Sequence, residues 1–95
     1  MATLYITEFR YIGDRGVQAA ECPPLADQTV SIGGGSLQSA AFNDGTKFIR
    51  VHTDTNCSVL VGANPTATTG KLRIAAGQTE YFSVQGGQKI AVITN

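Results

Sequence analysis

The sequence contains little of what a catalytic or metal-binding centre needs. Its 95 residues include one histidine, two cysteines and no tryptophan. A protein metal site draws on several His, Cys or carboxylate ligands, and nucleophilic catalysis needs a nucleophile, a base and an orienting group. No such set surrounds His52, and no other motif supplies one. We therefore expect a protein that is not an enzyme, with no catalytic residue, no cofactor and no metal. His52 is expected at the surface or in a subunit contact.

Charge is scarce as well. Charged residues make up 15% of the chain, and seven basic groups balance seven acidic ones. Nucleic-acid-binding proteins gather Lys and Arg on one face, because phosphate contacts supply much of their affinity. Here the basic residues are spread along the chain, so we do not expect the protein to bind nucleic acid. A net charge near zero, together with the thin core of so small a domain, favours self-association or attachment to something else. We expect a homo-oligomer, either a dimer or a trimer.

Long apolar runs are missing too. No stretch approaches the ~20 apolar residues that span a bilayer, and the N-terminus lacks the basic start and apolar run of a secretory signal. Neither a membrane segment nor a signal peptide is expected. Cys22 and Cys57 lie far apart in the sequence and have no metal-ligand spacing. They are predicted to be free thiols, with a disulfide between them as the alternative.

The sequence does contain short strand-like segments separated by turn residues. No segment shows a helical period, and about eight segments have the β-branched or alternating pattern of strands. This pattern predicts an all-β protein: a single small β-sandwich or jelly-roll-like domain over residues 1–95, built from short antiparallel strands. The expected strands are Thr3–Arg10, Gln28–Ile32, Leu37–Phe42, Lys47–Thr53, Cys57–Gly62, Lys71–Ala75, Thr79–Val84 and Lys89–Thr94, with Val17–Ala20 as a ninth candidate.

Turns and core residues follow from the same pattern. Gly33–Gly35 is expected to join two strands, because the Lys-Ser/Thr of a phosphate-binding loop is missing. Asn43–Thr46 is predicted to close a hairpin, since Asp-Gly suits the positive-φ positions of such turns. Ile90–Ile93 does not alternate, which predicts a strand covered on both sides. The expected core is Leu4, Ile6, Val30, Ile32, Ile49, Val51, Val59, Val61, Leu72, Ile74, Phe82, Val84, Ile90 and Val92.

Several segments of the second half resemble small structural proteins of tailed bacteriophages. They are Phe48–Asp54, Cys57–Val59, Gly62–Thr68, Arg73–Phe82 and Lys89–Ile93. Proteins of that kind include capsid decoration or cement proteins, which coat the head lattice as β-rich oligomers. The resemblance implies a non-catalytic virion protein, made in the host cytoplasm, that binds the major capsid protein or another virion protein. The alternative is a small β-sandwich binding module for a carbohydrate or a protein.

The N-terminal segment is the candidate interface. If Thr3–Arg10 has a free strand edge, it can extend a partner's sheet through main-chain hydrogen bonds, which need no charge pattern. The expected contact residues are Leu4, Tyr5, Ile6, Phe9 and Tyr11. Carbohydrate binding usually relies on aromatic platforms, and the three tyrosines, Tyr5, Tyr11 and Tyr81, lie on separate segments.

Overall fold

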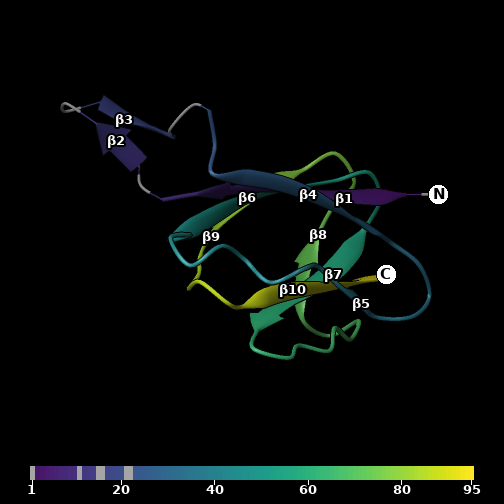
Figure 1. Cartoon of the computed structure of the whole chain (residues 1–95). Helices are drawn as coiled ribbons and strands as arrows, with labels where there is room; N and C mark the ends of the chain where they lie inside the picture. The colour runs from purple at the N-terminus through teal and green to yellow at the C-terminus, as the bar shows by residue number, and fades with distance from the viewer. Residues whose placement is uncertain (1, 11, 15–16, 21–22) are drawn as a thin grey trace.

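The computed structural model describes residues 2–10, 12–14, 17–20 and 23–95 of the chain. Two four-stranded sheets pack face to face, and a two-stranded hairpin extends from one end (Figure 1). The first sheet has the order β4-β1-β6-β9, and the second has the order β5-β10-β7-β8. Every strand pair is antiparallel. The predicted all-β sandwich is confirmed.

The strand bounds are close to those expected from the sequence. The first sheet contains β1 (Thr3–Phe9), β4 (Ala26–Ser31), β6 (Phe48–Thr53) and β9 (Thr79–Ser83). The second sheet contains β5 (Leu37–Gln38), β7 (Cys57–Gly62), β8 (Leu72–Ile74) and β10 (Lys89–Thr94). The hairpin consists of β2 (Ile12–Asp14) and β3 (Val17–Ala20). The ninth candidate strand is therefore present, whereas the Leu37–Phe42 strand is shorter than expected.

Alternating apolar side chains from both sheets form the core. Leu4 and Ile6 of β1 and Ile49 and Val51 of β6 face β7 and β10, and all four are at most 1% exposed. Most of the predicted core is confirmed, with Val61 and Phe82 packed at its margin. Leu72 is the exception at 55% exposed, although Ile74, two residues later on the same edge strand β8, is buried.

Strand β10 is covered on both faces, as its unbroken apolar run predicts. Ile90, Ala91 and Val92 are fully buried. The loop formed by residues 63–70 is anchored to neighbouring segments of the second sheet: Ser58 Oγ donates to the Thr69 carbonyl at 3.2 Å, and Gln38 Nε2 donates to the Pro65 carbonyl at 2.7 Å. The loop formed by residues 63–70 therefore covers part of the outer side of the second sheet.

The predicted hairpin at Asn43–Thr46 is wrong. A turn is present, since the Thr46 amide donates to the Asn43 carbonyl at 3.0 Å, but the chain passes through it from the second sheet to the first. Gly45 has no positive φ; among the described glycines only Gly77 and Gly87 have one. The segment before the turn bonds instead to the β9–β10 loop. The Phe42 amide donates to the Gln88 carbonyl, and the Gly87 amide donates to the Phe42 carbonyl. This pairing between distant residues replaces the local hairpin.

Candidate functional site: the outer face of the first sheet

The outer face of the first sheet carries polar and aromatic side chains in ordered rows. Strand register places Thr7 between Asp27 and Arg50, with Tyr81 beyond Arg50 on β9. The neighbouring row contains Thr29, Tyr5, His52 and Thr79. Residues two apart on a strand share a face, so all eight side chains lie on the side away from the core.

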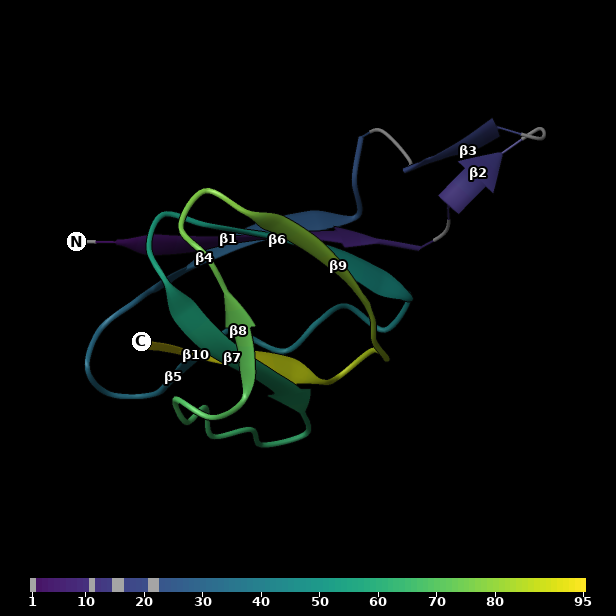
Figure 2. The same ribbon diagram turned by 180° about the vertical axis from the view of Figure 1, so that it is seen from behind.

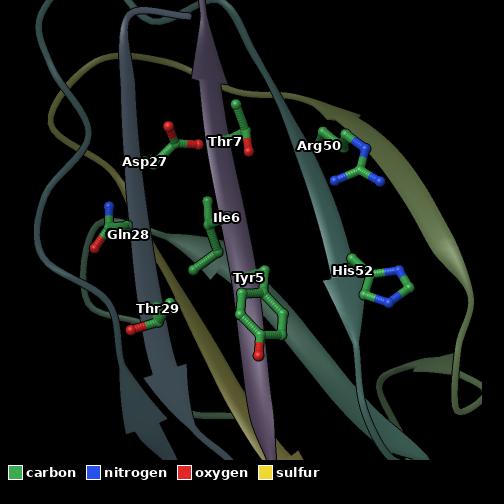
Figure 3. A pocket seen from close by; sticks show the side chains of 8 residues that line it. All are labelled: Tyr5, Ile6, Thr7, Asp27, Gln28, Thr29, Arg50 and His52. Carbon is green, nitrogen blue, oxygen red and sulfur yellow. The ribbon is translucent and has the colours of Figure 1, made fainter.

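A shallow depression lies in this face. Its volume is about 670 Å³, and its lining consists of Tyr5, Ile6, Thr7, Asp27, Gln28, Thr29, Arg50 and His52 (Figure 3). The hollow follows from the lengths of the side chains: Thr7 is short, whereas Asp27, Arg50 and Tyr5 around it are longer. The volume falls within the range of about 300–1,000 Å³ that is typical of ligand sites.

His52 is held in place on this face by its neighbour on β9. Its Nδ1 lies 2.9 Å from Thr79 Oγ1, and its ring lies 6.3 Å from that of Tyr5, with the two planes tilted by 42°. The imidazole is half-buried. The expectation of a surface histidine agrees with this position, and the hydrogen bond leaves Nε2 as the ring nitrogen available to a ligand.

The five residues expected at a partner interface separate into different environments. Leu4 and Ile6 are core residues, and Phe9 is 4% exposed, with its ring stacked on that of Phe48 at 4.8 Å between centroids. Tyr5 is the accessible member, at 43% exposed. Tyr11 lies outside the described residues. The free edge is wrong as well, because β1 pairs with β4 on one side and with β6 on the other.

The sequence did not identify five of the lining residues as part of a site: Thr7, Asp27, Gln28, Thr29 and Arg50. The alternation of β1 and β6 does place Tyr5, Thr7, Arg50 and His52 on the outward-facing sides of their strands. It does not show that β4 pairs with β1, which is what brings Asp27 to the opposite side of Thr7 from Arg50. Tyr5 and Tyr81, the exposed tyrosines among the described residues, also share this face, since register aligns Tyr5 with His52 and Tyr81 with Arg50.

The described residues contain no group of three or more His, Cys, Asp or Glu side chains close enough to hold a metal ion. None of the described segments is a helix long and apolar enough to cross a membrane.

Cys57 is a free, fully buried thiol at the start of β7. Burial raises its pKa, and the hydrogen bond between its Sγ and Thr53 Oγ1 at 3.5 Å partly opposes that rise. The neutral thiol is therefore favoured in the folded state. The resulting stability is present below the usual thiol pKa and is lost as the pH rises through the raised value. Cys22 lies outside the described residues.

This burial predicts slow chemical modification of Cys57. In a Cys22→Ser variant, an aromatic disulfide reagent at mildly alkaline pH should label Cys57 at least about tenfold more slowly in the folded protein than in urea. The buried sulfur is out of reach of the reagent, and burial also raises the pKa of the thiol, which lowers the fraction of reactive thiolate. Labelling at equal rates in buffer and in urea would show that the thiol is accessible in the folded protein.

Comparison with known proteins gives no match. No protein-family model, curated protein or solved structure matches this chain.

Proposed function

We propose that this protein is a non-catalytic structural protein of a tailed-phage virion. It is a decoration or cement protein that binds the head lattice and stabilises it. Its partner is the major capsid protein or another virion protein, and it reaches the capsid after synthesis in the host cytoplasm. The likeness to phage structural proteins supports this role. That likeness covers β6 to β10, which form most of the scaffold, and it does not identify the attachment surface.

The observation that carries the proposal is the hairpin of β2 and β3. Both views show it standing clear of the sandwich, beyond the end of β1 (Figures 1 and 2). Its two strands pair only with each other among the described strands, so each has an outer edge that no other strand covers. An isolated two-stranded hairpin is marginally stable in water. A neighbouring subunit that pairs with one of these edges would stabilise it.

This hairpin replaces the N-terminal strand as the proposed attachment element. The unpaired edges of β2 and β3 can extend a sheet of the capsid protein, or of a second copy, through main-chain hydrogen bonds. Strand β1 cannot do so, because both of its edges are occupied. Backbone pairing has no long-range charge component, so the contact should respond weakly to salt, which screens surface charges within about 8 Å at physiological ionic strength.

Removing the hairpin should therefore abolish attachment to the capsid without unfolding the sandwich. We expect a variant in which a short Gly-Ser linker replaces residues 11–22 to keep the sandwich but to lose binding to capsids. Co-sedimentation with capsids of the phage that encodes the chain measures this, and far-UV circular dichroism checks the fold. The matched control is Asp27→Ala, an exposed change on the sandwich. The wild-type protein should bind equally at low and at several-hundred-millimolar salt.

The possible results of this experiment test the hairpin mechanism and the virion role separately. Capsid binding that survives hairpin removal would refute the hairpin mechanism but leave the virion role in place. Wild-type protein that does not sediment with those capsids would refute the virion role itself. Light scattering should give a dimer or a trimer for the wild-type protein, and a monomer would favour the binding-module alternative.

A further inference from the structure

We infer that the depression on the outer face of the first sheet is a carbohydrate-binding site. Six of its eight lining residues lie on the outward-facing sides of their strands, and we name these six the outer-face site: Tyr5, Thr7, Asp27, Thr29, Arg50 and His52. The inference does not rest on the proposed virion role, because the site and the hairpin are separate parts of the molecule (Figures 1 and 3).

The first observation is the position of the aromatic ring. Figure 3 shows the ring of Tyr5 nearly face-on from outside the sheet, so a flat face is turned toward solvent. The side chain is 43% exposed, and His52 lies beside it at 6.3 Å between ring centroids. An exposed ring face is suited to the apolar C–H surface of a sugar ring, which can stack on it and displace water.

The second observation is that two charged side chains on this face, Asp27 and Arg50, pair with no described residue. The side chains of Asp27 and Arg50 flank Thr7 on neighbouring strands, and neither has a hydrogen-bond or ion-pair partner among the described residues. Strand spacing places their Cα atoms about 10 Å apart, which leaves room for a small polar ring between them. Asp27 accepts hydrogen bonds and Arg50 donates them, so together they can bind hydroxyl groups at two sides of one ligand.

The third observation is the balance of charge, which selects the ligand class. Asp27 and Arg50 contribute one charge of each sign, and the other side chains of the outer-face site are those of Tyr5, Thr7, Thr29 and His52. A phosphate or sulfate would meet the Asp27 carboxylate as well as the Arg50 guanidinium. A neutral polyhydroxylated ring can use both. The hydroxyls of Thr7 and Thr29 add groups that both donate and accept.

The concave shape argues against a second copy of this chain as the occupant. Two hollow faces packed together would leave a void, whereas stable protein interfaces are packed as densely as protein interiors. A neutral oligosaccharide fills the hollow from outside. The class of ligand is therefore a neutral hexose or N-acetylhexosamine chain.

The test measures binding of the full-length protein to an array of neutral oligosaccharides, built from hexose and N-acetylhexosamine units. Titration with the best neutral glycan, followed by NMR, then gives the affinity. We expect at least one neutral glycan to bind, and Tyr5→Ala to weaken that binding by about tenfold or more, since stacking on the ring is lost. Tyr5→Phe should retain binding, because the ring remains.

Tyr81→Ala is the matched control. It removes a tyrosine from the same face, 56% exposed but outside the depression, and it should leave the affinity within about twofold. Three results would overturn the inference: no neutral glycan binding at millimolar concentration, equal losses for Tyr5→Ala and Tyr81→Ala, or a change of oligomer mass in Tyr5→Ala. The last result would assign the face to a second copy of the chain. The glycan assay does not involve capsids, so its result does not depend on whether the proposed virion role is correct.

Discussion

Replacing Glu8 by alanine is expected to lower the free energy of unfolding by about 2–4 kcal/mol, since buried donors that lose their acceptor cost about 1–3 kcal/mol each. Glu8 is 2% exposed and faces the interior from β1. Its Oε1 accepts from the Asn43 amide at 2.8 Å and from Thr46 Oγ1 at 2.7 Å, and its Oε2 accepts from Gln28 Nε2 at 3.1 Å. One carboxylate therefore joins β1, β4 and the turn at Asn43–Thr46.

Two control variants separate the hydrogen bonds from the charge. Glu8→Gln keeps the shape and one acceptor oxygen, so it should cost less, about 1 kcal/mol. Asp27→Ala removes an exposed carboxylate that has no partner among the described residues and should change stability by no more than about 0.5 kcal/mol. Urea unfolding followed by circular dichroism measures all three variants. A Glu8→Ala protein as stable as the Asp27→Ala protein would show that the buried hydrogen bonds contribute nothing.

Replacing Gly86 by alanine is expected to cost about 1–3 kcal/mol or more, because the added methyl group has no space. A Cβ at this position would lie 2.5 Å from the Asp44 carbonyl oxygen, 2.6 Å from Asp44 Cα and 2.8 Å from the Asn43 carbonyl oxygen. All three are backbone atoms, which cannot move away by a change of rotamer as a flexible side chain can. The β9–β10 loop and the Asn43–Thr46 turn would have to move apart.

Gly34→Ala is the control for this substitution. A Cβ at Gly34 would meet nothing within 4 Å, so this variant should be within about 0.5 kcal/mol of the wild type. Equal unfolding midpoints for Gly86→Ala and Gly34→Ala would refute the close approach of the two loops. Glu8 and Gly86 both secure the same turn, so a Glu8→Ala/Gly86→Ala double variant should cost less than the sum of the two single changes.

The strands and their faces could be predicted from local sequence. Leu4 and Ile6 alternate with Tyr5 and Thr7, and this period alone assigns one set to the core and the other to the outside. The uninterrupted run Ile90–Val92 likewise predicts a strand that is covered on both faces, and the loop over the second sheet provides that cover.

The pairing of the strands could not be predicted in this way. Alternation within Thr3–Arg10 is the same whether the strand is at an edge or in the centre, and the structure places it between β4 and β6. The Asp44-Gly45 signal is local too, and contacts with Gly86–Gln88 override it. The outer-face site depends on three strands that are far apart in sequence, so no spacing in the chain identifies it.

Electron cryomicroscopy of phage capsids incubated with the purified protein would show whether the hairpin attaches the protein to the head. We expect the sandwich at repeated positions on the head lattice, with β2 or β3 extending a sheet of a capsid subunit or of a neighbouring copy. Capsids with no added density, or sandwiches attached to the lattice while the hairpin points freely into solvent, would contradict attachment through the hairpin.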